Sequence, residues 1–428
     1  MSFPDWARVK RPMFMIGLLC FAGGCSQEPT FRLNNVYLYV QEAKFGEQGS
    51  YNAYKNELQS ILVSLFGTPD EPKVPPLPDV DTAALLDLDE LQVAAGPVRL
   101  DEQKRARGLY REHCAHCHGV SGDGAGPTAS FLNPYPRDFR KGVFKFKSTP
   151  KGEKPTHADL HRTLMEGIPG TAMPSFRLLD QPDRDALINY VMYLSIRGEV
   201  ERKLMEELGE LDAGEKLIRT ESPEDFAEDV AYIKEIAAGI VSRWIDAPSR
   251  VTEITRGPTQ WDITTSRYES EEARLAAIEH GRRLFYGEIA NCVKCHGESA
   301  LGDGQTNDYD DWAKDFIPPN VTPAQVQELS DKYTALGALP PRNIRPRNLR
   351  RGVFRGGRRP IDIYWRVRNG IDGSPMPAAL MKPDGAPPEA KGLTEEDLWA
   401  LVTYVRNLEF EAVSRPPEHL VENERLRP

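Results

Sequence analysis

Apolar residues recur at helical spacing in six stretches of the chain, which polar, glycine-rich and proline-rich segments separate. Apolar positions three and four residues apart are typical of a helix that buries one face. The pattern predicts helices over residues 35–66, 101–112, 181–194, 226–244, 272–285 and 394–408. Glycines at positions 46 and 49 are expected to break the first stretch into two helices.

The second half of the chain repeats the first. The segment PRDFRKGVF at residues 136–144 returns as PRNLRRGVF at 346–354, and EGIPGTAMP at 166–174 returns as NGIDGSPMP at 369–377. The two motifs follow in the same order in both halves, and an amphipathic helix comes after them each time. Duplication of one unit explains this arrangement, so we expect two similar domains.

The N-terminus has the features of an export signal. A basic region at residues 8–11 precedes an apolar run at 13–24 that is too short to span a bilayer. Small residues then precede Cys25, as in a bacterial lipoprotein signal, although Ala22 stands where that signal has leucine. We expect an exported chain, lipidated at Cys25 and anchored to a membrane facing the periplasm. An uncleaved anchor and plain secretion are the alternatives.

Composition divides the remaining chain into segments. Residues 199–229 hold twelve acidic and four basic side chains, which is compatible with a solvated helical linker packed between the repeat units or with an acidic docking face. The predicted organisation is a signal peptide at 1–24, a helical tether with a Pro-rich linker at 25–95, a first repeat unit at 96–198, an acidic helical connector at 199–270, a second repeat unit at 271–413 and a flexible tail at 414–428.

Four of the six cysteines lie in two copies of the motif C-x-x-C-H. This spacing is the attachment signature of c-type haem, in which two thiols form thioethers with the haem vinyl groups and the next histidine ligates the iron. A bare C-x-x-C also occurs in redox dithiols and zinc sites, but the other cysteines, Cys20 and Cys25, belong to the signal region. We therefore expect two covalently bound haem c groups. The attachment residues are Cys114, Cys117, Cys292 and Cys295, and the proximal iron ligands are His118 and His296.

Each repeat unit also carries a Met-Pro dipeptide in a glycine-rich loop. Met173 lies 55 residues after His118, and Met376 lies 80 residues after His296. Such a loop can carry a thioether across the haem face, and this soft ligand favours Fe(II). We therefore expect Met173 and Met376 to be the second axial ligands. The extra length of the second unit lies in a polar, Pro-containing insertion at residues 307–343.

Other residues compete for the second axial position. His157 and His161 precede the Met-Pro loop of the first unit at helical spacing, but the second unit has no histidine at the matching place. In the second unit Met381 is an alternative ligand. His113 and His116, which flank the attachment cysteines, are expected to be exposed.

Further residues are candidates for the surroundings of the haem. The second ring nitrogen of His118 is expected to donate to a backbone carbonyl, and the loop at 119–127 resembles the segment that supplies it. The second unit keeps Gly-Asp-Gly at 302–304 but lacks the proline that follows in the first. Basic residues of the first repeated motif are candidates to pair with haem propionates, with a role as surface charges as the alternative. They are Arg137, Lys141, Arg347 and Arg351.

At these residues the chain resembles class I bacterial c-type cytochromes. The shared pattern is a helix, C-x-x-C-H-G, a Gly-Asp-Gly loop, a Met-Pro loop and a final helix with a Tyr-Val pair. The resemblance covers both repeat units but neither the N-terminal segment nor the connector. It implies an all-α fold with two tandem class I cytochrome c domains, joined by a helical connector and preceded by an N-terminal helical segment.

The predicted function is single-electron transfer by a carrier that is not itself an enzyme. With both axial positions filled, no small-molecule substrate reaches the iron. The chain looks like dihaem cytochrome subunits that serve oxidases, quinol-oxidising complexes or dehydrogenases, so its expected partners are redox proteins or a membrane respiratory complex. A net charge of −10 disfavours nucleic acid and suits a basic partner. The alternatives are a dihaem enzyme of the cytochrome c peroxidase type, with one open haem, and a haem-based sensor.

Overall fold

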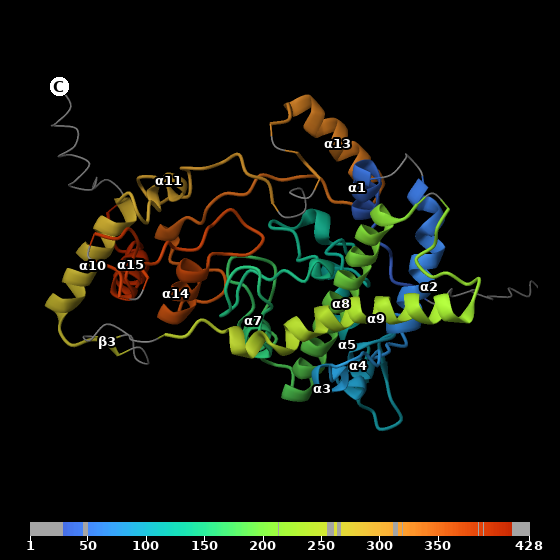
Figure 1. The fold of residues 1–428 in the computed structure, drawn as a ribbon. Helices are drawn as coiled ribbons and strands as arrows, with labels where there is room; N and C mark the ends of the chain where they lie inside the picture. Colours follow the sequence, from blue (N-terminus) through green and yellow to red (C-terminus); the bar gives the residue numbers. More distant parts are fainter. Residues whose placement is uncertain are drawn as a thin grey trace, which may run out of the picture.

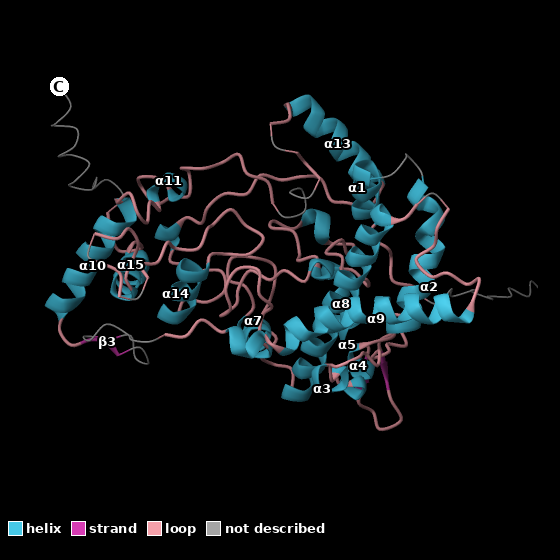
Figure 2. Cartoon of the chain, viewed as in Figure 1, coloured by secondary structure: helices cyan, strands magenta, loops and turns pink. Residues whose placement is uncertain are grey.

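The structure is a computed structural model that describes residues 29–45, 50–212, 214–254, 261–262, 267–310, 316–318, 320–383, 385–387 and 389–412. The predicted signal peptide, Cys25 and the predicted tail from residue 414 lie outside the described residues. Helices and loops make up nearly all of the described chain (Figures 1 and 2), which confirms the all-α fold class. Within these ranges no helix is long and apolar enough to cross a membrane.

The order of elements follows the repeat. The helices are α1 (Asn35–Phe45), α2 (Lys55–Phe66), α3 (Thr82–Leu85), α4 (Leu88–Ala94), α5 (Leu109–His113), α6 (Ala115–His118), α7 (His157–Glu166), α8 (Gln181–Glu207), α9 (Pro223–Ile245), α10 (Glu271–Tyr286), α11 (Val293–His296), α13 (Pro323–Ala335), α14 (Pro360–Asn369) and α15 (Glu395–Asn407). Two antiparallel pairs, β1 (Arg99–Leu100) with β2 (Ala106–Arg107) and β3 (Trp261–Asp262) with β4 (Arg267–Tyr268), are two residues long.

Helix α8 lies at the centre of the first domain. It is longer than predicted and continues through the boundary expected at residue 198. Its side chains are buried on several sides, Tyr190 and Tyr193 among them. The helix closely approaches the 3-10 turn η3 (Phe139–Lys141), because Gly198 has no side chain: a Cβ there would lie 2.2 Å from the Cα of Arg140.

The segment before the first haem motif is part of this core and does not form the expected tether. Phe31, Leu58, Leu62 and Phe66 are at most 1% exposed and pack in one cluster with α8. The rings of Phe31 and Phe66 each lie 6.1 Å from the ring of Tyr193. The first domain therefore covers the apolar face of α2 and part of that of α1, which gives both helices a stabilising role.

The helix predicted over residues 101–112 is wrong in its first half. The β1–β2 hairpin occupies residues 99–107, and α5 begins only at Leu109. The carboxylate of Asp101 accepts hydrogen bonds of 2.9 Å from the backbone N–H groups of Gln103 and Arg105. It also accepts from the side chains of Arg105 and Arg107. These local bonds replace helical ones, as Asp side chains do at turns.

The connector packs on the first domain through one face of α9. Ile233, Ala237, Val241 and Trp244 on this face are buried in the first-domain core. Much of the acidic charge is matched locally. The matched pairs are Glu199 with Lys154, Glu201 with Arg197, and Arg219 with Asp225, Glu228 and Asp229. The connector is therefore a structural layer of the first domain, and part of its acidic charge is engaged in intramolecular pairs.

Helices α10 and α15 cross at the centre of the second domain. Both helices were predicted within a residue or two of their observed ends, which confirms the amphipathic pattern. Gly281 makes the close crossing possible, since a Cβ there would lie 2.0 Å from the carbonyl oxygen of Ala400. The rings of Phe285 and Tyr404 lie 5.5 Å apart, and Tyr404 is completely buried.

The insertion of the second domain reaches back to the N-terminal segment. Its helix α13 lies beside α1 (Figure 1), and the two form a small separate cluster. Tyr333 is 6% exposed there, with its ring 4.6 Å from that of Phe316 and 6.1 Å from that of Tyr39. The insertion of the second domain therefore packs against the N-terminal segment of the chain.

Candidate haem sites

Each C-x-x-C-H motif forms a short helical turn that ends at a glycine. Helix α6 carries the first motif and α11 the second, and Gly119 and Gly297 follow with φ of 74° and 82°. Such φ values favour glycine, so the chain can turn sharply after each histidine. Both cysteines of each motif and the histidine belong to this turn, the arrangement that thioether attachment requires.

Both proximal histidines are held by the same type of hydrogen bond. Nδ1–H of His118 donates to the carbonyl of Arg137 at 3.0 Å, and Nδ1–H of His296 donates to the carbonyl of Arg347 at 3.1 Å. The expectation that the 119–127 loop supplies this carbonyl is wrong, because it comes from the first repeated motif instead. Because Nδ1 is engaged, Nε2 of each ring would be the atom that binds an iron.

Burial sets the protonation state of these groups. It lowers the pKa of His118 to about 4 and also lowers that of His296. It raises the pKa of the Cys114 and Cys292 thiols to about 12. The imidazoles are therefore neutral at physiological pH, which is the form that ligates a metal ion.

The glycine-rich loops after the two histidines have the same backbone bond, but their aspartates do not occupy equivalent positions. The N–H groups of Gly124 and Gly302 each donate to the carbonyl of the motif histidine at 2.8 Å, so these two residues are equivalent. Asp303 therefore stands two positions further along than Asp123. Both carboxylates nevertheless reach the glycine after the histidine, where a Cβ would lie 2.2 Å from Oδ1 of Asp123 and 2.0 Å from Oδ1 of Asp303.

Arg32, from the N-terminal segment, binds the loop of the first domain. Its guanidinium donates to Oδ2 of Asp123 from Nε at 3.1 Å and from Nη2 at 2.6 Å, and its backbone N–H donates to Ser121 at 2.7 Å. Asp123 is 3% exposed, whereas Asp303 is exposed and has no ion pair among the described residues. Sequence reasoning missed Arg32, because 91 residues separate it from Asp123 and no motif links them.

The two Met-Pro loops share one hydrogen-bond pattern. The carbonyl of Met173 accepts from Ile168 N–H at 3.1 Å, and the carbonyl of Met376 accepts from Ile371 N–H at 3.2 Å. A hydroxyl two residues before each methionine accepts from the methionine N–H, at 3.1 and 3.4 Å. Three residues after each methionine the chain donates to the preceding helix, at 2.9 and 3.0 Å. The loops are therefore structural equivalents, each fixed by backbone bonds.

The competing ligands occupy different surroundings. Met381 pairs with Leu393 in an isolated bridge and packs against the second-domain core, away from the equivalent loop position. His157 lies at the start of α7 with its side chain 54% exposed and 3.8 Å from Asp185. His116 is exposed, as expected, whereas His113 is half-buried near Phe176.

Two basic side chains near the second site indicate whether a haem would fit there, because no described acidic residue pairs with them. Nη2 of Arg347 and Nε of Arg355 are buried and have no hydrogen-bond partner among the residues that the structure describes. Burial lowers the pKa of Arg347, and burial together with Arg347 lowers that of Arg355 to about 10. Two cations forced together in a poorly hydrated place call for an anion. A haem propionate would supply it, so these residues fit the haem that the C-x-x-C-H motif calls for.

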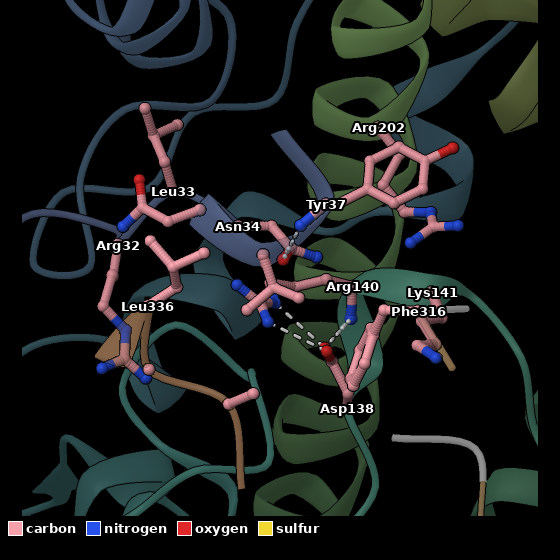
Figure 3. A pocket seen from close by; sticks show the side chains of 14 residues that line it. Arg32, Leu33, Asn34, Tyr37, Asp138, Arg140, Lys141, Arg202, Phe316 and Leu336 are labelled. Carbon is pink, nitrogen blue, oxygen red and sulfur yellow. Dashed lines mark hydrogen bonds and ion pairs between the residues drawn. The ribbon is translucent and has the colours of Figure 1, made fainter. Parts of the chain in front are cut away.

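The other propionate candidates lie in different places. The backbone of Arg137 holds His118, and Arg351 is exposed beside Arg347. Lys141 lines a small pocket between the N-terminal segment, η3 and the insertion, together with Arg202 and Phe316 (Figure 3). In the same view, Arg140 points to Asp138, which accepts two hydrogen bonds from its guanidinium at 3.0 and 2.9 Å.

Comparison with known proteins assigns the family. The cytochrome c family profile matches twice, at residues 103–195 and 278–409, which together are more than half of the chain. The chain therefore belongs to the cytochrome c family, which binds haem covalently and transfers electrons. No curated protein matches it. Among solved structures, it is similar to a chain of the reducing HAO-like protein complex of Kuenenia stuttgartiensis. The identity is 23% over 73% of this chain and 98% of that chain, with a TM-score of 0.41.

Proposed function

We propose that this protein is a dihaem electron carrier in which both irons are closed by a histidine and a methionine. The first site is formed by His118 and Met173, and the second by His296 and Met376. The chain acts as a relay or as the cytochrome subunit of a respiratory complex, and it has no substrate chemistry of its own.

One observation carries this proposal: the two Met-Pro loops have the same backbone hydrogen bonds at the same positions. A site that no longer used a methionine ligand would not need to keep the hydrogen bonds that fix its Met-Pro loop. A peroxidase-type enzyme needs one open or easily opened iron, and two equally fixed loops argue against that.

The residues of the chain prepare the site for electron transfer. When bound, the haem supplies a reversible one-electron centre. The bonds to the Arg137 and Arg347 carbonyls fix the orientation of the proximal rings, and they keep those rings in the tautomer that ligates through Nε2. The bonded loops around Met173 and Met376 would hold the thioethers in place. Fixed ligands on both faces limit the change in geometry between oxidation states.

The location in the cell is also part of the proposal. The basic region and apolar run before Cys25 support export and lipidation. A lipid at Cys25 would anchor the carrier to a membrane facing the periplasm. Only a few residues then separate this anchor from the buried Phe31, so the first haem domain would lie close to the membrane surface.

Haem content and the optical spectrum of the purified protein test the proposal. We expect two haems per chain, and one per chain when Cys114 and Cys117 are both replaced by serine. Both haems should be low-spin, with the weak far-red absorption of methionine-bound Fe(III). A high-spin haem in the unaltered protein would contradict the proposal and favour the peroxidase-type alternative.

A further inference from the structure

The Met-Pro loop of the second domain is bound by the first domain. Asp372, four residues before Met376, accepts a hydrogen bond of 2.9 Å from the N–H of Gly152. The same carboxylate forms an ion pair of 2.8 Å with Lys147. The side chains of this pair are only 4% and 10% exposed. A buried charge pair with a backbone donor fixes the direction from which the two domains meet.

The Met-Pro loop of the first domain is covered by the second in return. Gly170, three residues before Met173, has φ of 71°, and a Cβ there would lie 3.2 Å from Cγ1 of Val353 and 3.3 Å from Nη2 of Arg347. Arg347 is the residue whose carbonyl holds His296. One residue thus touches the distal loop of the first site and the proximal ligand of the second.

Equivalent residues of the repeat meet at the centre of this interface. Arg162 of α7 and Trp365 of α14 each lie five residues before the glycine that ends their helix, and the guanidinium of Arg162 lies 5.4 Å from the centre of the indole ring. Phe146 and Gly356 each lie two residues after the last phenylalanine of the repeated motif, and a Cβ on Gly356 would lie 2.3 Å from the Phe146 ring. Contacts between equivalent positions define an approximate two-fold axis, as in an isologous dimer.

Buried polar groups tie the two halves at this axis. Arg162 pairs with Asp159 of its own helix at 2.9 Å and lies 3.7 Å from Asp362, the equivalent acid of α14. Both carboxylates are almost fully buried. Next to them, Asn369 donates to the carbonyl of Ser148 at 3.1 Å, and Thr252 of the connector bonds both residues. The interface therefore requires one relative position of the domains.

We propose that this two-fold interface holds the two haem sites at one fixed separation for electron exchange within the chain, and that Arg162 is its positioning residue. The proposal rests on the proposed function. With haem bound at both sites, one electron would pass from Fe(II) of one site to Fe(III) of the other, and no bond would form or break. The two Met-Pro loops face each other's domain, so the exchange takes place across the interface.

Pulse radiolysis of Arg162→Gln tests the proposal, together with peptide-resolved hydrogen exchange. The unaltered protein should show one concentration-independent exchange phase between the haems. The variant should lose this uniform phase, and the amides of residues 148–152 and 369–373 should lose protection. Arg162→Lys, which keeps the charge but not the planar stack on Trp365, should give a partial loss and remain folded.

Arg177→Gln is the matched control, because Arg177 is exposed in the same domain and, in the described part of the chain, its side chain bonds to Ser175 alone. It should change neither measurement. Unchanged exchange and protection in Arg162→Gln would overturn the proposal. A high-spin haem in the unaltered protein would instead overturn the proposed function, and hydrogen exchange at 148–152 and 369–373 would then still decide whether Arg162 holds the interface.

Discussion

The two haem domains hold their candidate iron ligands with the same hydrogen bonds but differ in the elements that surround these ligands. In both, a carbonyl of the repeated motif holds the proximal histidine, and matched bonds fix the Met-Pro loop. The first domain adds α1, α2, α4 and α9 around α8, whereas α10, α14 and α15 form the core of the second. Duplication has therefore kept the geometry that the iron requires and left the outer layers free to diverge.

The charge beside the proximal loop is the sharpest difference between the domains. Asp123 is buried and paired with Arg32, whereas Asp303 is exposed to water. A charge near an iron changes its reduction potential more when water is excluded, because screening is weaker there. Among the described residues, the first domain thus holds a buried charge pair beside its proximal loop, and the second does not.

The largest expected effect comes from replacing Phe66, which packs the N-terminal segment into the core of the first domain. Phe66 is fully buried, so Phe66→Ala should destabilise the first domain by about 3–5 kcal/mol through lost burial and a cavity. Denaturant unfolding followed by hydrogen exchange should show earlier opening of the first domain.

Phe285→Ala is the counterpart in the second domain, where Phe285 is 1% exposed. It should lower the stability of the second domain first. If Phe66→Ala leaves the first domain as stable as before, α2 is a dispensable addition and the comparison fails.

A smaller effect is expected at the paired carboxylate. Arg32→Gln leaves Asp123 without its cation, which should cost about 1–3 kcal/mol of stability in the first domain. The uncompensated negative charge favours Fe(III), so the potential of one haem should fall while the other stays constant. Potentiometric titration of both variant and parent measures this shift.

Asp303→Asn serves as the control, since its carboxylate is exposed and screened by water. Its effect on both potentials should be smaller than that of Arg32→Gln. Equal shifts from the two substitutions would remove the proposed difference between the domains.

The smallest effect should come from the contact between α1 and α13. Tyr333→Ala removes two aromatic contacts of a small cluster, worth about 0.5–1.5 kcal/mol each. Hydrogen exchange should rise in α1 and α13, while both haem spectra stay the same. A spectral change would mean that the insertion supports a haem site directly.

Much of the fold follows from local patterns in the sequence. The spacing of apolar residues predicts α10 and α15 to within one residue at each end and α9 to within three, since each helix buries one face. The same pattern could not predict which surface covers α1 and α2, because an apolar face is non-directional. It also missed the β1–β2 hairpin, where a single side chain, Asp101, satisfies the backbone locally.

The part of the candidate sites that lies within short sequence motifs could be predicted. The C-x-x-C-H and Met-Pro motifs locate the candidate ligands, which stay predictions until a haem is observed. The carbonyl partners of His118 and His296, the shifted register of Asp303, and the Arg32–Asp123 pair depend on how distant segments meet. A local sequence motif does not show which backbone carbonyl accepts a hydrogen bond or which distant residues form a pair.

Carbon monoxide binding to the reduced protein tests the central claim most directly. If methionine closes both irons, the unaltered protein binds no carbon monoxide, and Met173→Ala and Met376→Ala each bind one equivalent. Binding of one equivalent by the unaltered protein would contradict the account, because one iron would then be open.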